Sequence, residues 1–263
     1  MKPVRNPLVA IVFWMVIGLL YLPLLNLIMQ AFLVDPRNIG SGFSTIWLRK
    51  LFASDAFWRP LVTSIEIGVL AATTAVAVAT FGAVGLSRVR STLPPAVQTL
   101  ILLPILLPEV ITGLSLLIFF LLIRVELGFF TVVLAHASFS ASFVYFILVE
   151  QLRKLDPQME EAAQDLGARG SQIFWKVTFP NIIPGLMGGW LLAFTLSFDD
   201  FLISFFTSGA GLTTLPLKIY SMMRIGISPE LNALSFVMIC ISFSLVITLL
   251  SKEQGREWVL KSS

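Results

Sequence analysis

The feature that most constrains this chain is a series of long apolar runs, almost free of charge, separated by polar connections. Splitting the chain at its charged residues leaves six such runs, at 8–32, 61–86, 96–123, 128–149, 182–206 and 231–251. A helix needs about 20 apolar residues to cross a bilayer, and only helices and closed barrels satisfy their own backbone there. We therefore predict an all-α, polytopic integral membrane protein with six transmembrane helices.

Composition narrows the possible functions further. Apolar residues make up 57% of the chain and charged residues 13%, more apolar than a soluble core of 263 residues requires. The net charge of +3 is too small to indicate a nucleic-acid partner, and Cys240, the single cysteine, excludes an intrachain disulfide. The sequence contains no G-x-x-x-x-G-K-[ST] loop and no metal-ligand set. We expect one transmembrane domain over residues 1–263, with no nucleotide or metal site of its own.

The N-terminus and the basic residues indicate an orientation. Lys2 and Arg5 precede an apolar stretch, as in a signal peptide, but the uncharged run 6–34 far exceeds the roughly 7–15 residues of a signal core. We therefore expect a retained first span. With six spans both termini share one side, whose connections and tails carry 11 Lys and Arg against 7 on the other side. The positive-inside rule then favours cytoplasmic termini.

The polar connection 150–181 carries the signals of two short helices. Asp156 and Pro157 suit the N-cap and first position of a helix, and Gly167 is placed where a helix ends in a left-handed residue. We expect Ser171 to cap a second helix over 172–178.

The second of these helices carries large aromatic residues. Phe174 and Trp175 are too large and apolar to face water in a mere connector, and Pro180 marks the return to the membrane. Three interpretations compete: these rings lie at the membrane interface, they pack under their own bundle, or they contact a partner protein.

The same connection contains a recognisable motif. It holds Glu161-Ala162-Ala163, then Gly167 after three residues, then Val177-Thr178-Phe179-Pro180 after nine more. This pattern resembles the EAA signature of ABC-importer permease subunits, with Val177 in place of Ile and Phe179 in place of Leu. The resemblance implies a type I ABC-importer permease fold, in which this segment is a cytoplasmic helix-turn-helix that docks on an ATPase subunit.

Under that resemblance, seven residues form the ATPase-coupling surface: Glu161, Ala162, Ala163, Gly167, Phe174, Trp175 and Pro180. The small alanines let a partner helix approach closely, Gly167 permits the turn, and Glu161 offers a carboxylate to a cationic or hydrogen-bonding partner.

Ionisable residues inside the predicted spans are the candidates for a transport pathway. An ionised side chain at the centre of a spanning helix costs about 2.5–3.5 kcal/mol on the insertion scale. The spans contain Glu66, Glu109, His136, Asp199 and Asp200 but no Lys or Arg, a bias that suits a cationic solute. We predict that Asp199, Asp200 and Glu109 line the pathway.

Each candidate also has a plainer interpretation. Adjacent helical positions point about 100° apart, so one of Asp199 and Asp200 faces a pathway while the other caps a following segment or pairs with Lys218 or Arg224. His136 is expected to be a hydrogen-bonded packing residue. Pro108, beside Glu109, kinks or breaks the third span, for packing or for a pathway.

A second resemblance concerns the substrate. Residues 190–200, 215–221, 226, 228–234 and 108–111 are similar to the spermidine/putrescine permease family, and to the second permease subunit of such systems. The resemblance implies polyamine transport across the bacterial inner membrane, with a homologous permease, a cytoplasmic ABC ATPase dimer that binds ATP, and a periplasmic substrate-binding protein. Importers of other organic cations, amino acids or iron share much of this pattern. An autonomous channel or secondary transporter is the alternative of another class, although no inverted repeat is visible.

The predicted topology is directly testable. In a chain whose Cys240 is replaced by Ser, a cysteine at Ser171 should be shielded from an impermeant thiol reagent added outside. Cysteines at Ser41 and Gly211 should react, and a reporter fused after Ser263 should report the cytoplasm. Labelling of the Ser171 position from outside would exclude ATPase coupling through this segment.

Overall fold

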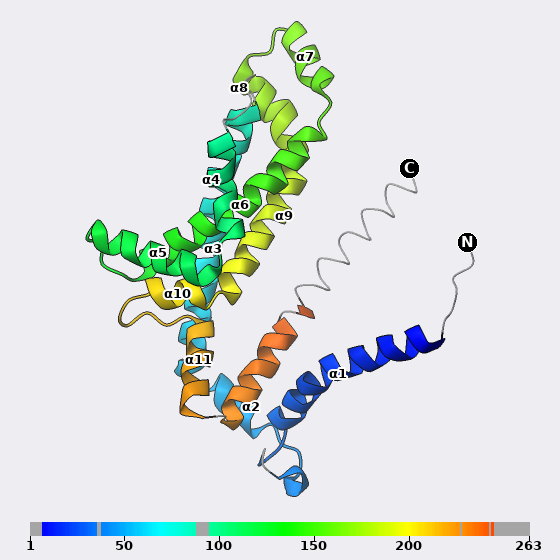
Figure 1. Ribbon diagram of the computed structural model, residues 1–263, viewed down its shortest axis with the longest axis vertical. Helices are drawn as coiled ribbons and strands as arrows, with labels where there is room; N and C mark the ends of the chain where they lie inside the picture. The colour runs from blue at the N-terminus through cyan, green and yellow to red at the C-terminus, as the bar shows by residue number, and fades with distance from the viewer. Residues whose placement is uncertain (1–6, 36–37, 88–94, 227, 242, 245–263) are drawn as a thin grey trace. The chain divides into compact units, whose positions relative to one another are not determined.

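The computed structural model describes residues 7–35, 38–87, 95–226, 228–241 and 243–244, and its regular structure there is helical apart from an isolated bridge between Leu33 and Phe43 (Figure 1). In order, the elements are α1 (Pro7–Ala31), η1 (Ile39–Ser41), α2 (Ile46–Phe52), α3 (Asp55–Ser87), α4 (Pro95–Leu106), α5 (Glu109–Leu122), α6 (Phe129–Arg153), α7 (Pro157–Asp165), α8 (Gly170–Ile173), the π turn η2 (Phe174–Thr178), α9 (Phe179–Asp199), α10 (Leu202–Thr207), α11 (Leu215–Ile225) and an apolar helix, Pro229–Ile241. The all-α prediction is confirmed.

The chain divides into two compact units, which are described separately: Met1–Trp58 with Ile219–Ser263, and Arg59–Lys218. Among the described residues four helices are long and apolar enough to span a membrane, and a fifth span results if α4 and α5 count as one. The predicted sixth span, 231–251, lies partly outside the described residues.

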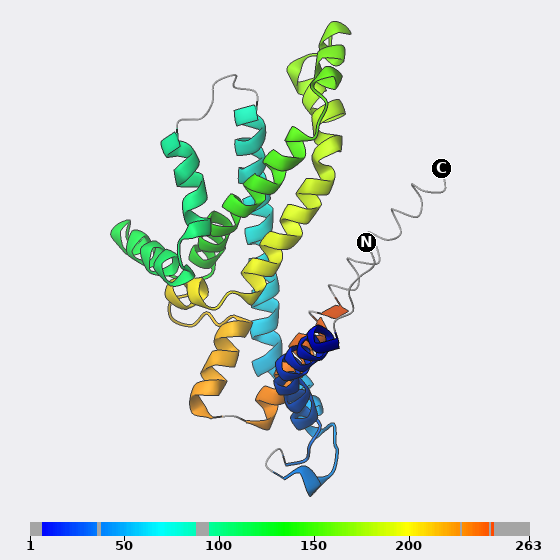
Figure 2. The same ribbon diagram turned by 45° about the vertical axis from the view of Figure 1, so that its right-hand side comes forward.

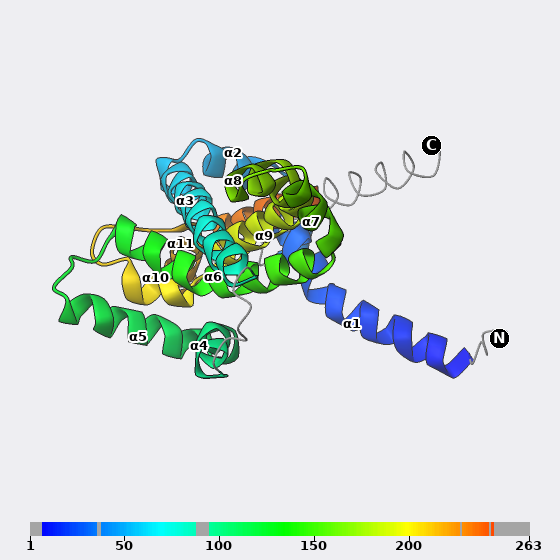
Figure 3. The same ribbon diagram turned by 90° about the horizontal axis from the view of Figure 1, so that it is seen from above.

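The predicted third span, 96–123, is two helices rather than one. Thr99–Leu106 and Glu109–Leu122 meet at 115°, and Figure 3 shows α5 running away from α4. The break falls at Pro108, whose φ of −56° and ψ of 137° are not helical. Proline supplies no N–H and disfavours the helical conformation of the residue before it, so the helix stops there.

The core of the unit Arg59–Lys218 lies where α3, α6 and α9 meet (Figures 1 and 2). Four alanines of α3 pack against α6 and α9: Ala72, Ala75, Ala79 and Ala83. Their partners are Val144 and Leu148 of α6 and Ala193 of α9. Small residues let helices approach closely in a membrane, where packing rather than water exclusion drives association.

In the other unit, three contacts attach the end of α1 to its neighbours. Trp47 of α2 donates its indole N–H to the carbonyls of Leu33, at 3.1 Å, and Val34, at 3.2 Å. Asn232 Nδ2 donates to Gln30 Oε1 at 3.0 Å. The rest of α1 exposes its apolar side chains, as expected of a helix whose solvent is lipid.

The connection 150–181 differs from the prediction at its second helix. That helix begins at Gly170 with Arg169 as its N-cap, where the Arg169 N–H donates to Gln172 Oε1 at 2.8 Å, so the predicted Ser171 cap is wrong. It then continues through η2 into α9, giving one helix from Gly170 to Asp199. In the wide η2 turn the Phe179 N–H bonds the Phe174 carbonyl. Pro180 has no backbone N–H to donate. The wide turn tolerates this missing hydrogen bond, so the proline does not end the helix.

The close approach of α6 and α9 yields a stability prediction. Gly189 is buried, and a Cβ placed on it would lie 2.9 Å from Val144 Cγ1, whereas neighbouring Gly188 is exposed with open space around it. Gly189→Leu should lower the free energy of unfolding by about 1–3 kcal/mol through overpacking. Gly188→Leu should leave it nearly unchanged. Thermal unfolding of the purified protein in detergent measures both, and equal midpoints would contradict this packing.

Candidate functional site

Helix α7 is closed at both ends by residues that the sequence singled out. Asp156 Oδ1 accepts the Gln158 N–H at 3.0 Å, and Pro157 occupies the first turn. At the other end Gly167 has a φ of +79°, and its N–H donates to the Gln164 carbonyl at 2.8 Å. Glycine adopts this left-handed conformation without strain, so the expected turn is confirmed.

One hydrogen bond fastens α7 to η2. The hydroxyl of the buried Thr178 donates to Glu160 Oε1 at 2.5 Å. Glu160 is therefore engaged within the hairpin that α7 forms with the helix beginning at Gly170, while the next residue, Glu161, is exposed. A cavity of about 480 Å³ lies beside this contact, lined in part by Asp156, Glu160 and Ile173.

The predicted coupling residues lie mostly on the surface of this hairpin. Glu161, Ala162, Gly167, Trp175 and Pro180 are exposed, and Ala163 and Phe174 are half-buried. The Trp175 ring contacts two aromatic neighbours, with centroids 5.0 Å from Phe174 and 4.9 Å from Phe179.

Two further apolar residues of the hairpin are exposed and were not predicted from the sequence. Leu166 is 89% exposed and Met159 is 47% exposed. Trp175, which was predicted, is 62% exposed. Positions 159 and 166 are seven residues apart and so lie on one helix face, which was the available signal. Glu161, Met159, Leu166 and Trp175 define what we call the hairpin surface, and apolar groups exposed in this way mark a contact with another protein or with lipid.

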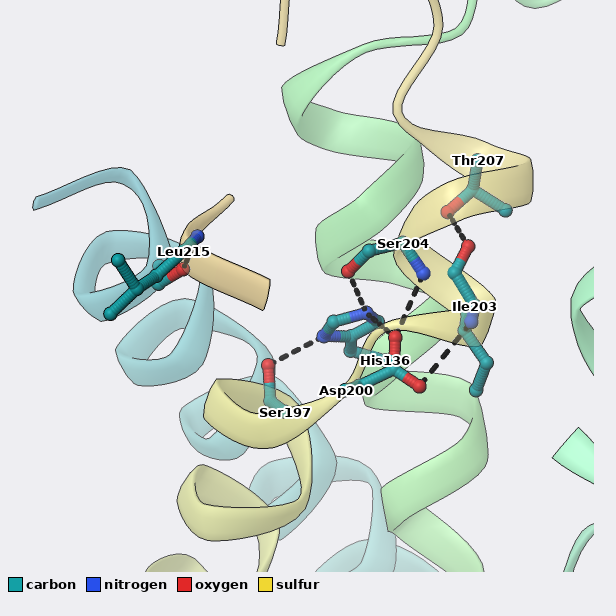
Figure 4. A network of polar contacts seen from close by, with 8 residues as sticks. His136, Ser197, Asp200, Ile203, Ser204, Thr207 and Leu215 are labelled. Atoms are coloured by element: carbon teal, nitrogen blue, oxygen red, sulfur yellow. Dashed lines mark hydrogen bonds and ion pairs between the residues drawn. The ribbon is translucent and has the colours of Figure 1, made fainter. Parts of the chain in front are cut away.

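The second group of predicted residues lies at the other end of α9. This helix ends at Asp199, and Asp200 follows in an extended conformation, with φ −70° and ψ 126°. Asp200 Oδ1 accepts the Ile203 N–H at 3.3 Å, and Oδ2 accepts the Ser204 N–H at 2.8 Å (Figure 4). Its side chain is 7% exposed, whereas Asp199 is exposed. Of the two aspartates, Asp200 caps the following helix, as one predicted alternative had it.

Glu109 belongs to the same place. It is the exposed first residue of α5, and α5 packs against α10. A Cβ placed on Gly113 of α5 would lie 3.3 Å from the Ile203 Cα, so the two backbones are close. The Glu109 carboxylate lies within electrostatic range of Asp199 and Asp200. The structure thus brings together the three predicted acids, which we call the acidic cluster.

His136 of α6 contacts both α9 and α10 beside this cluster. Its Nδ1 lies 2.6 Å from Ser197 Oγ of α9, and its Nε2 lies 3.1 Å from Ser204 Oγ of α10 and 3.2 Å from Asp200 Oδ2. The prediction of a hydrogen-bonded packing residue is confirmed. Ser197 and Ser204 were missed, because a serine in an apolar run carries no signal of its partner.

An aromatic stack leads along α9 toward Asp199. The rings of Trp190, Phe194 and Phe198 follow one another at centroid distances of 5.5 and 5.7 Å, nearly parallel. Their spacing of four residues was the sequence signal. A Cβ on Gly68 of α3 would lie 3.0 Å from the Phe194 ring, so the stack holds α9 against α3.

This arrangement offers charge and shape rather than covalent chemistry. Two exposed carboxylates, Asp199 and Glu109, can attract a cation, while Asp200 is engaged by backbone donors. Among the described residues no three His, Cys, Asp or Glu side chains meet as a metal site would require.

Comparison with known proteins identifies a family and relatives. The family described as binding-protein-dependent transport system inner membrane component matches residues 64–252. The putrescine transport system permease protein PotI of Escherichia coli K12 is 38% identical over 240 residues, covering 88% of this chain and 85% of PotI. The spermidine/putrescine transport system permease protein PotC of Haemophilus influenzae is 35% identical, covering 92% of this chain and 93% of PotC.

A solved structure shows the same fold. A chain of a bacterial ABC transporter involved in the import of the acidic polysaccharide alginate superposes with a TM-score of 0.71, at 18% identity, covering 96% of this chain and 98% of that one. The fold of an ABC-transporter permease, which the sequence motif implied, is confirmed.

Proposed function

The chain belongs to the binding-protein-dependent transport system inner membrane components, the permeases of ABC importers, and we propose that the solutes it moves are polyamines such as putrescine and spermidine. The observation that carries the proposal is the acidic cluster. A polyamine bears two or more positive charges, and an unpaired ion is strongly disfavoured in a low-dielectric passage. Fixed carboxylates along the passage lower that barrier.

Within the cluster the three acids take different roles. Asp199 and Glu109 are exposed and would meet the substrate. Asp200 has both carboxylate oxygens engaged by backbone N–H groups, so it would hold the end of the pathway rather than touch its cargo. From the sequence, all three acids were predicted to line the pathway.

The hairpin surface would dock on a cytoplasmic ABC ATPase, which binds and hydrolyses ATP in an assembly with a homologous permease and a periplasmic substrate-binding protein. Met159 and Leu166 would form the coupling contact together with the residues predicted from the sequence: Glu161, Ala162, Ala163, Gly167, Phe174, Trp175 and Pro180. The helix Gly170–Asp199 runs from this surface to the acidic cluster without a break, roughly 45 Å at 1.5 Å per residue. Movement of the hairpin on ATPase closure would therefore reach the cluster through one helix, as in rigid-body switching.

The proposal also fixes an orientation in the bacterial inner membrane. ATP is available only inside the cell, so the connection 150–181 and both termini would be cytoplasmic. The excess of Lys and Arg on that side, 11 against 7, supports this orientation.

The turn of the hairpin provides a test of ATPase coupling. Gly167→Val should reduce transport-coupled ATP hydrolysis about tenfold, because a positive φ costs a β-branched residue on the order of 1–3 kcal/mol. Gly167→Asn is the matched variant, since Asn tolerates this conformation, and it should retain most of the activity. The measurement is ATP hydrolysis by the reconstituted complex with loaded binding protein. Full coupling in the Val variant would refute the docking role of this turn.

The acidic cluster provides a test of the substrate. Asp199→Asn should cut polyamine uptake about tenfold or more, equivalent to 1.4 kcal/mol of lost stabilisation, and Glu109→Gln should also reduce it. Complex assembly should be intact, because both side chains are exposed. Glu66→Gln removes an exposed carboxylate from α3 and should leave uptake unchanged. Radiolabelled putrescine and spermidine uptake measures all three, and wild-type rates in both cluster variants would make these acids structural.

A further inference from the structure

The buried imidazole of His136 is the strongest feature that the proposed function does not use. Its side chain is 1% exposed and lies on α6, outside the acidic cluster. It contacts the last turn of α9 through Ser197 and the first turn of α10 through Ser204, and it reaches the carboxylate of Asp200 between them (Figure 4). One ring therefore bridges both sides of the break that ends α9.

The donors and acceptors of this network give the direction of the contact between His136 and Asp200. A neutral imidazole carries one N–H, and a carboxylate only accepts. Nε2 therefore carries a hydrogen, which faces Asp200 Oδ2 and Ser204 Oγ, while Nδ1 shares a hydrogen bond with the Ser197 hydroxyl. With the two backbone donors of α10, every oxygen of Asp200 has a partner.

The position of Asp199 follows from this network. Asp199 is the last helical residue and is joined directly to Asp200, whose carboxylate is held by His136 and by α10. Where α9 stops, and so where the exposed Asp199 carboxylate points, depends on those bonds. Members of a buried polar network support one another, so removing the imidazole takes one of the three donors from the buried Asp200 carboxylate and leaves only the two backbone N–H groups of α10 to hold it.

We propose that His136 is a positioning residue of the transport pathway: it does not touch the substrate, but through Asp200 it sets the orientation of Asp199 and so the passage of the cationic solute. This inference rests on the proposed function of the acidic cluster. The contact that matters is the one from Nε2 to Asp200, and the contact from Nδ1 to Ser197 is secondary.

Variants at position 136 separate the two contacts. His136→Gln places an amide N–H near the position of Nε2 and should keep the bond to Asp200, whereas His136→Asn reaches only toward Ser197, and His136→Leu keeps neither. The readout is the number of polyamine molecules transported per ATP hydrolysed by the reconstituted complex. His136→Leu and His136→Asn should lower this ratio about tenfold, the loss expected for one hydrogen bond to a charged group, while His136→Gln stays near wild type.

Two controls identify a merely structural effect. Ser140→Ala removes a buried hydroxyl one turn along α6 that has no hydrogen-bond partner among the described residues, and the ratio should not change. Thr131→Val removes the 2.8 Å bond from Thr131 Oγ1 to the Thr207 carbonyl, which ties the far end of α10 to α6. It should lower complex yield but not the ratio of transport to hydrolysis.

A double variant decides whether His136 acts through Asp199. Combined with Asp199→Asn, His136→Leu should lower the ratio no further than Asp199→Asn alone, because residues in one network are not additive. Additive losses, equal ratios for the Gln and Asn variants, or proportional loss of transport and hydrolysis would overturn the inference. If His136→Leu does not assemble, the comparison of Gln with Asn decides. A wild-type ratio in Asp199→Asn would instead refute the proposed function of the cluster.

Discussion

The geometry of the acidic cluster depends on one contact, the capping of α10 by Asp200. A helix that stops within a membrane leaves backbone groups without water as a partner, and such breaks persist only where protein satisfies them. The two carboxylate oxygens of Asp200 accept the N–H groups of Ile203 and Ser204 in the first turn of α10, and His136 of α6 contacts the same carboxylate through Nε2. The exposed Asp199 beside this contact gains its place from that arrangement.

A second constraint is the continuity of the helix Gly170–Asp199. Two prolines of this protein have opposite effects: Pro108 ends α4 before a bend of 115°, whereas Pro180 lies inside a continuous helix. The difference lies in the turn around each of them. At η2 the helix widens, and the Phe179 N–H donates to the Phe174 carbonyl. The N–H that Pro180 lacks therefore does not interrupt the helix. At Pro108 the backbone is extended, and α5 instead packs on α10. Because η2 preserves the helix, Trp175 of the hairpin surface and Asp199 of the acidic cluster lie on one continuous helix.

Local signals predicted much of this structure, since local chemistry decides it. The cap at Asp156, the left-handed turn at Gly167 and the break at Pro108 all depend on residues next to one another in the chain. The predicted start of the second hairpin helix was wrong by two residues, because Arg169 and Gln172 cap this helix together in place of the predicted Ser171. A side chain that caps from within the helix is hard to anticipate from propensity.

The sequence by itself determined that the chain lies in a membrane, that it is all-α and which family it belongs to. Apolar runs, charge and an uninterrupted motif are properties of the chain alone. It also marked Asp199, Asp200 and Glu109 as candidates for a functional role, because an ionisable side chain within a membrane span is energetically costly. Only the tertiary structure decided between the two aspartates. Asp200 is the buried aspartate because it contacts His136 of another helix, α6, and accepts the N–H of Ser204. That N–H is available to a side chain only because α9 ends at Asp199 and a new helix begins after it. Neighbours distant in sequence determine which carboxylate is buried, and no local pattern records them.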